Sequence, residues 1–180
     1  MIIVIIIIVI IVLAIILLYN HLVGLNIRCK NAWAGIDNQL KRRYDLIPNL
    51  VEVTKGYATH ERETLMEVIK ARNDEGTMNE RAKESEEVSN SVKKLLAVAE
   101  NYPDLKANEL FKNLQIELTG TEDKIAFARQ FYNDSVQKYN TAIMSFPNNI
   151  LAKMMNYKEK EYFQVDESEK QTVKVDLKWS

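Results

Sequence analysis

An unbroken apolar run at the start of the chain constrains its fold more than any other feature. Residues Met1 to Leu18 are all apolar, and no formally charged side chain occurs before Arg28. As a helix this run is about 27 Å long, and extension to Val23 gives about 35 Å, enough to cross the hydrocarbon core of a bilayer. Each Ile, Leu or Val favours insertion, by about 5–10 kcal/mol for the whole run. The run predicts a transmembrane helix with ends at Ile2 and Val23.

Two other kinds of N-terminal segment fit this run less well. A cleaved signal peptide needs a basic start and a small-residue cleavage site, but the chain begins Met1-Ile2-Ile3 and continues with Tyr19-Asn20-His21 after the apolar core. A lipoprotein signal needs small residues before its cysteine, whereas Arg28 precedes Cys29. We therefore expect a retained span and an incidental thiol. A single cysteine forms no internal disulfide, so it leaves the redox compartment open.

Basic residues gather on the C-terminal side of the run. Lys and Arg beside a span resist translocation. Within about twenty residues after Val23, the only acid is Asp37, and the basic residues are Arg28, Lys30, Lys41, Arg42 and Arg43. We therefore expect a single-pass protein of the cell membrane, with its N-terminus outside and its body in the cytoplasm. The alternative is a body outside the cell that acts as a surface adhesin.

The rest of the chain has the composition of a charged helical domain. All 24 Lys and Arg and all 25 Asp and Glu follow residue 27, and the net charge of −1 argues against a nucleic-acid partner. Five Gly and three Pro leave few sites for tight turns. We predict an all-α fold, in which the transmembrane helix is followed by an elongated antiparallel bundle of about four long helices. The expected domains are an anchor (1–23), the bundle (24–156) and a partly ordered or disordered tail (157–180).

Pro and Gly define the expected helix boundaries. An apolar stripe with steps of three and four residues crosses Pro48, so we expect a kink near Tyr44 to Ile47, with a new helix that is capped by Asp45 and has Pro48 in its first turn. Pro103 suits the first position of a later helix. Gly120 is expected to divide the last two helices, with Thr119 or Thr121 as a cap.

Weaker signals mark three further places. A boundary is expected near Gly76. Pro147 should end the last long helix, and a short amphipathic helix is expected over residues 148–155. The alternation over Thr172–Trp179 suggests a strand or a disordered tail.

Residues capable of catalysis are sparse and scattered. His21 and His60 are separated by tens of ångströms of helix. His60-Glu61 lacks the second histidine of the zinc motif H-E-x-x-H, because residue 64 is Thr. A glycine-rich phosphate loop is also missing from the sequence. We predict that the protein is not an enzyme and has no catalytic residues, metal site or cofactor.

The basic trio Lys41-Arg42-Arg43 is the candidate interaction surface. On a continuous helix Arg42 lies about 28 Å beyond Val23, whereas salt screens surface fields within about 8–10 Å. We therefore expect these residues to pair with acids inside the bundle or to contact a protein partner. The tyrosines along the helices are expected to be half-buried, with hydroxyl partners such as Asn49, Asn108 or Asn140.

Several peptides carry a family pattern over about residues 19–163. They include Ala32-Trp33, the run QLKRRYDLIPN from Gln39 to Asn49, and YPDLKAN from Tyr102 to Asn108. The single residues that match the pattern are Trp33, Tyr44, Asp45, Pro48, Asn49, Gly56, Tyr57, His60, Glu61, Tyr102, Pro103, Lys106, Asn108, Glu122, Tyr132, Tyr139, Asn140 and Pro147. In these residues the chain resembles the LemA family of bacterial membrane-anchored proteins. It departs from the family at Asn156, where relatives usually have Gly before an aromatic residue.

The resemblance implies one N-terminal span, a short extracytoplasmic N-terminus and a cytoplasmic helical bundle, but it brings no established activity. We predict a non-enzymatic interaction or scaffold protein of the bacterial cell envelope. Its expected partners are the lipid bilayer and a protein in or at the membrane, and self-association is left open. The alternative is an accessory subunit of a membrane protease, or an unrecognised hydrolase.

Overall fold

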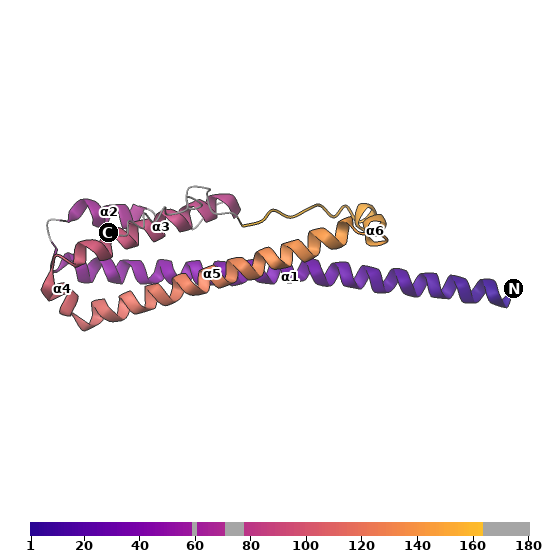
Figure 1. Cartoon of the computed structure of the whole chain (residues 1–180), viewed down its shortest axis with the longest axis horizontal. Helices are drawn as coiled ribbons and strands as arrows, with labels where there is room; N and C mark the ends of the chain where they lie inside the picture. Colours follow the sequence, from indigo (N-terminus) through magenta and orange to yellow (C-terminus); the bar gives the residue numbers. More distant parts are fainter. Residues whose placement is uncertain (59–60, 71–77, 164–180) are drawn as a thin grey trace, which may run out of the picture. The chain divides into compact units, whose positions relative to one another are not determined.

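The computed structural model describes residues 1–58, 61–70 and 78–163, and every regular element within them is a helix (Figure 1). The elements are α1 (Ile2–Lys55), α2 (Arg62–Lys70), α3 (Met78–Ala99), α4 (Pro103–Ala107), α5 (Glu109–Met144) and α6 (Asn148–Met154). No strand occurs in these ranges. The predicted all-α class is therefore confirmed.

The chain divides into two compact units. Among the described residues, unit 1 contains Met1–Arg43 and Leu118–Tyr162, and unit 2 lies within Tyr44–Glu117 and includes Phe163. The helices α1 and α5 each contribute one part to unit 1 and another part to unit 2.

The surface of α1 changes along its length. All side chains from Ile2 to Leu17 are exposed. From Leu22 onward, α1 instead has a buried stripe at helical spacing, which in unit 1 comprises Leu22, Cys29, Ala32, Ile36, Leu40 and Arg43. This spacing is that of one face of an amphipathic helix.

Within unit 1, α1 and α5 pack against each other in antiparallel directions. The guanidinium carbon of Arg28 lies 5.3 Å from the ring centroid of Phe131. The rings of Trp33 and Tyr132 meet edge to face, with their centroids 5.7 Å apart. Further along α1, Arg43 pairs with Glu122. Residue numbers thus rise along α1 as they fall along α5. The α5 residues buried in this unit are Leu118, Thr121, Ile125, Tyr132, Ser135, Val136, Tyr139, Asn140 and Ile143.

In unit 2, α2 packs against α3. The buried side chains of α2 are Leu65 and Val68. On α3, Val88 and Leu95 are fully buried. An exposed ion pair with an N–O distance of 3.1 Å joins Glu67 of α2 to Lys94 of α3.

Pro48 does not end a helix, because α1 continues through it to Lys55. The predicted new helix capped by Asp45 is therefore wrong. Pro48 is exposed, whereas Tyr44, Ile47 and Leu50 beside it are buried. An interior proline costs about 3 kcal/mol, and each large buried side chain contributes about 1.5–3 kcal/mol. Burial of these three side chains thus offsets the cost of the proline.

Gly120 does not end a helix either, because it lies inside α5. The hydroxyl of Thr121 donates a 2.7 Å hydrogen bond to the backbone oxygen of Leu118 within the helix, so the expected cap at Thr119 or Thr121 is wrong. A helical glycine costs only about 1 kcal/mol relative to Ala. Burial of Leu118 and Ile125 on the same helix is enough to offset this cost.

Two boundaries that we did not expect are present. The helix α1 ends at Lys55, after which the amides of Tyr57 and Ala58 donate to the oxygen of Thr54 at 3.0 and 2.8 Å. The helix α5 begins after Asn108, whose Oδ1 accepts a 3.0 Å hydrogen bond from the amide of Phe111. This is the geometry of an N-cap. The pairs Lys55-Gly56 and Asn108-Glu109 were the available sequence signals.

Other expected boundaries are present. Pro103 begins α4, as predicted from its suitability for the first turn. The short helix predicted over residues 148–155 is α6, and α5 ends three residues before Pro147. The expected boundary at Gly76 and the expected strand or tail over Thr172–Trp179 lie outside the described residues.

Candidate functional site

The chain after α6 returns along α5 within unit 1. We call residues 157–162 the strap. The hydroxyl of Tyr139 donates to the backbone oxygen of Lys158 at 3.2 Å, and the hydroxyl of Tyr132 donates to that of Glu161 at 3.1 Å. The strap therefore runs antiparallel to α5.

Asn140 holds the centre of the strap through two hydrogen bonds to one residue. Its Nδ2 donates to the backbone oxygen of Lys160, and its Oδ1 accepts from the backbone amide of Lys160, both at 2.9 Å. The side-chain amide thus takes the place of a neighbouring backbone for an extended segment, which satisfies both polar groups of Lys160.

The turn into the strap is a Schellman motif at the end of α6. Asn156 has a positive φ of 55°. The amide of Tyr157 donates to the oxygen of Ala152 at 2.9 Å, and the amide of Asn156 donates to that of Lys153 at 3.1 Å. Asparagine tolerates this left-handed conformation better than most residues other than glycine. The chain thus keeps a left-handed turn at the position where it departs from the family pattern.

Aromatic contacts support the strap. The rings of Tyr139 and Tyr157 are tilted to each other, with their centroids 6.1 Å apart. The Nζ of Lys160 lies 5.1 Å from the centroid of the Tyr139 ring, within the range of a cation–π interaction. Tyr139 therefore contacts the strap through its ring as well as through its hydroxyl.

The titratable groups beneath the strap are held neutral. Burial raises the pKa of Tyr132 to about 12, with smaller contributions from Cys29 and Glu161. Burial also raises the pKa of Tyr139, as do Tyr157 and Cys29. At Cys29, burial raises the thiol pKa and outweighs the opposing effect of the nearby cations Lys160 and Arg28. The phenols are thus available as hydrogen-bond donors, whereas the protonated thiol is a poor nucleophile. The site is suited to holding a backbone segment.

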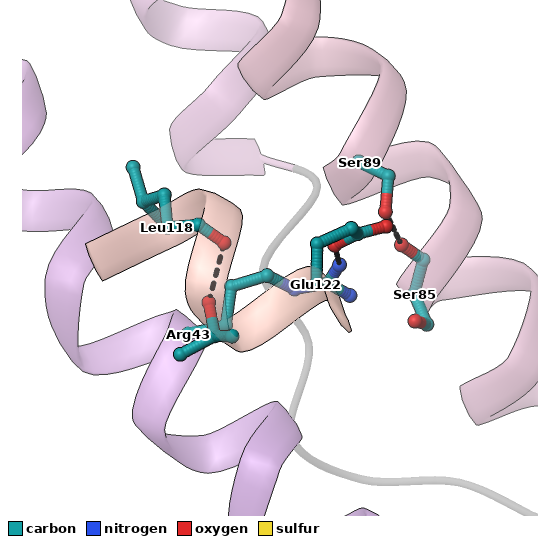
Figure 2. Close-up of polar contacts among 6 residues, drawn as sticks. Arg43, Ser85, Ser89, Leu118 and Glu122 are labelled. Atoms are coloured by element: carbon teal, nitrogen blue, oxygen red, sulfur yellow. Dashed lines mark hydrogen bonds and ion pairs between the residues drawn. The ribbon is translucent and has the colours of Figure 1, made fainter. Parts of the chain in front are cut away.

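The basic trio does not lie on a single surface. Arg43 is buried and pairs with Glu122, so for this one member of the trio the structure shows pairing with an acid of the bundle. Figure 2 shows Arg43 of α1 reaching Glu122 of α5. The exposed part of the trio is therefore Lys41 and Arg42.

Several motif residues of unit 2 form polar contacts at the ends of its helices. Tyr57 Oη accepts a 3.1 Å hydrogen bond from Asn108 Nδ2, so Asn108 serves as a tyrosine partner as expected. The hydroxyl of Tyr102 donates to Glu61 at 3.2 Å. Burial raises the pKa of Tyr102, and the contact with Glu61 raises it further. Lys106 forms an exposed ion pair with Glu100.

The remaining motif residues have varied positions. Trp33 and Tyr132 meet where α1 packs on α5. The residues Asp45, Pro48, Asn49, Gly56 and Pro147 are exposed. His60 lies outside the described residues. In the described ranges, no three His, Cys, Asp or Glu side chains lie close enough together to hold a metal ion.

Sequence reasoning alone did not find the strap. The family resemblance singled out Tyr132, Tyr139 and Asn140 but gave them no common role. Their partners are backbone groups 19 to 29 residues away in the sequence. A backbone carbonyl has no residue-specific signal, so only the Asn156-Tyr157 turn hinted that the chain reverses there.

Comparisons with known proteins agree with the sequence resemblance. The model of the LemA family matches residues 32–177. The magnetosome proteins MamQ 1 and MamQ 2 of Paramagnetospirillum magneticum are each 37% identical to this chain over 75 residues, which are 42% of this chain and 28% of each relative. Protein LemA of Metamycoplasma hominis is 25% identical over 155 residues, which are 84% of this chain and 71% of that protein. The matches thus span less than a third of the MamQ proteins.

Proposed function

The chain belongs to the LemA family, and on this premise we propose that it is a single-pass membrane-anchored, non-enzymatic interaction or scaffold protein of the bacterial cell envelope. Its N-terminus lies outside and its helical body in the cytoplasm. Membrane localisation is supported by the family, by the relatives and by the apolar run of α1.

One observation carries the proposal: the apolar run is uncovered and continuous with the packed part of α1. Its most apolar 18-residue window has a mean hydropathy of 3.9, and none of that window is buried within the protein. A core helix of a soluble protein buries such a surface against its neighbours. Lipid is the environment that would cover all sides of this segment. One helix then serves as both the anchor and the first helix of the body.

The positions of the charges support the orientation and the interaction role. Arg28 and Lys30 are exposed just beyond the span, where basic residues favour the cytoplasmic side. Lys41 and Arg42 are exposed farther along α1, and we assign them to the surface that meets a protein partner. The names of the relatives reported above are not enzyme names.

Crosslinking in native membranes tests the interaction role. A photoreactive residue in place of Lys41, within the full chain, is expected to give one defined adduct, identified by mass spectrometry. The double variant Lys41→Glu/Arg42→Glu, with the photoreactive residue moved to Asn38, should reduce that adduct at least several-fold. The matched control Lys112→Glu/Lys138→Glu makes the same charge change at two other exposed sites and should leave it unchanged. A chain that never gives an adduct would contradict the proposal.

A protease experiment tests the orientation separately. Protease added to intact cells should leave the body intact, and protease added after membrane permeabilisation should digest it. Digestion of the body in intact cells would place it outside and would support the adhesin alternative.

A further inference from the structure

An exposed apolar corner joins α5 to α6 in unit 1. We call Met144, Phe146, Ile150 and Met154 the apolar corner. Phe146 is 80% exposed and Met154 is 78% exposed, and the other two members are more than half exposed. Four large apolar side chains within eleven residues are therefore left uncovered by this unit.

The packing of α5 on α1 determines the level of the corner along α1. Arg28 lies against Phe131, and the two helices run in opposite directions. Met144 lies 13 residues beyond Phe131, about 20 Å further along α5. The same distance from Arg28 towards the N-terminus of α1 ends near Ile15. The corner therefore lies level with the C-terminal part of the apolar run.

Burial on α1 supports the same register independently. The side chains from Ile2 to Leu17 are exposed, Leu18 is half-buried and Leu22 is fully buried. Protein cover on α1 thus begins at Leu18, close to the level obtained from the packing distance. In Figure 1, α5 can be followed to its C-terminal end, where it leads into α6.

A bilayer that surrounds the span would therefore meet the corner too. A hydrocarbon core about 30 Å thick that begins at Ile2 ends near Leu22, so Met144, level with Ile15, lies about 10 Å inside the inner boundary of the core. Amphipathic helices at such a boundary bury their apolar face about 5–10 Å deep. Lys153 on α6 and Lys158 on the strap are exposed and line one surface hollow with Met144 and Glu159. Their ammonium groups suit lipid phosphates.

We propose that the apolar corner inserts into the inner lipid boundary beside the transmembrane segment and forms a second membrane contact. The occupant of this surface is lipid because the surface is continuous with the lipid-exposed part of α1. The inference rests on the proposed membrane anchoring. Two contacts about a helix diameter apart restrict rotation of unit 1 about the axis of α1, which a single span leaves free.

Collision measurements on spin-labelled protein test the proposal. The full chain with Cys29→Ala is reconstituted into vesicles of phosphatidylcholine and phosphatidylglycerol, and a nitroxide is attached at one new cysteine, Met154→Cys. The matched control is Phe127→Cys, because Phe127 is a 79% exposed apolar residue on α5 of the same unit, far from the corner. Val9→Cys reports on the span. Oxygen concentrates in lipid and a nickel chelate in water, so the ratio of their collision rates reports the surroundings of each label.

The oxygen-to-nickel ratio at residue 154 is expected to approach that at residue 9 and to exceed that at residue 127 at least several-fold. A ratio like that at residue 127 overturns the proposal. Low collision rates with both reagents also overturn it, because they indicate cover by a second copy or another protein. A water-like ratio at residue 9 contradicts the proposed membrane anchoring, and therefore also the proposed insertion of the apolar corner. A lipid-like ratio at residue 9 without one at residue 154 contradicts only the proposed insertion of the apolar corner. Ile150→Cys provides a second reporter if a label at residue 154 unfolds α6.

Discussion

Residues 2–17 and residues 22–54 of α1 belong to one helix, yet they differ in how their side chains are covered. In the first segment every side chain is exposed, and all of them are apolar. In the second, a buried stripe alternates with exposed polar positions, and it contains fully buried residues such as Leu40 and Leu50. Helical backbone geometry is shared by the two segments. The side-chain pattern therefore distinguishes an expected lipid contact from a protein contact.

The largest expected effect comes from charged residues placed in the first segment, which test whether that segment contacts lipid. Ile7→Arg with Ile11→Arg costs about 5–7 kcal/mol of insertion free energy, against about 5–10 kcal/mol in favour of the whole run. We expect the membrane fraction of the protein after carbonate extraction to fall sharply. Ile36→Arg, which places one charge in the second segment, should instead unfold the body. An unchanged membrane fraction for the double variant would show that the first segment does not anchor the protein.

Truncation of one leucine in each segment gives the next largest effect. Leu40→Ala should lower the free energy of unfolding of the body by about 2–5 kcal/mol, because Leu40 is fully buried. Leu13→Ala should change it by less than about 0.5 kcal/mol, because Leu13 is exposed. Denaturant unfolding of the detergent-solubilised full chain measures both values. Equal losses would mean that the two segments are equally covered by protein.

Removal of Pro48 sharpens the account of the second segment. Pro48→Ala should raise the free energy of unfolding by up to about 3 kcal/mol, because Pro48 is exposed and lies inside a continuous helix. Pro103→Ala is the matched control, since Pro103 occupies the first turn of α4, where proline costs little. Thermal unfolding followed by circular dichroism compares them. Equal responses would contradict a continuous helix at Pro48.

Loss of the Glu122 carboxylate tests the polar contact on the buried stripe. Glu122→Gln keeps the side-chain shape but removes the charge that faces buried Arg43. We expect a loss of about 1–3 kcal/mol in the free energy of unfolding, below the cost of breaking a fully buried pair because Glu122 is partly exposed. Asp123→Asn changes the same charge at the neighbouring exposed position and should have an effect within about 0.5 kcal/mol. If the two variants behave alike, the ion pair does not stabilise the contact.

The smallest effect concerns the alkaline stability of the packed segment. Tyr132 is neutral in the folded state up to a pH of about 12, whereas an unperturbed tyrosine ionises near pH 10. The unfolded state therefore loses a proton first, so the free energy of unfolding should fall as the pH rises from 10 to 12. Tyr132→Phe should remove this contribution to the decline. Denaturation at pH 9 and pH 11 measures it, and identical pH dependence in the two proteins would argue against a buried Tyr132 phenol.

Features encoded in a few adjacent residues could be predicted from the sequence. The apolar run specified a candidate membrane helix, and Pro103 correctly marked the start of α4. The helix boundaries predicted at Pro48 and Gly120 were wrong, because the free-energy cost of placing each residue inside a helix is smaller than the free energy gained by burial on the same helix. That gain depends on neighbours distant in the sequence, and no local rule contains it.

The candidate site depends on contacts between distant parts of the chain. Arg43 and Glu122 are separated by 79 residues, and Tyr132 binds a backbone oxygen 29 residues away. From the sequence we expected the basic trio to pair with acids or to contact a protein partner, but the sequence could not single out Glu122 among the acids of a highly charged chain. Tyr132, Tyr139 and Asn140, which hold the strap, could be recognised in the sequence only as residues of the family pattern, with no shared role.

Because α1 is one continuous helix, it can act as a lever between the membrane span and the body. Between Val23 and Arg43 no break interrupts the helix, so this part is a stiff arm about 30 Å long. In the proposed membrane arrangement, a change of about 10° in the tilt of the span, within the range seen for membrane helices, displaces Arg43 sideways by about 5 Å. Bilayer thickness would then be transmitted as movement to Lys41 and Arg42, the residues that we propose meet a protein partner.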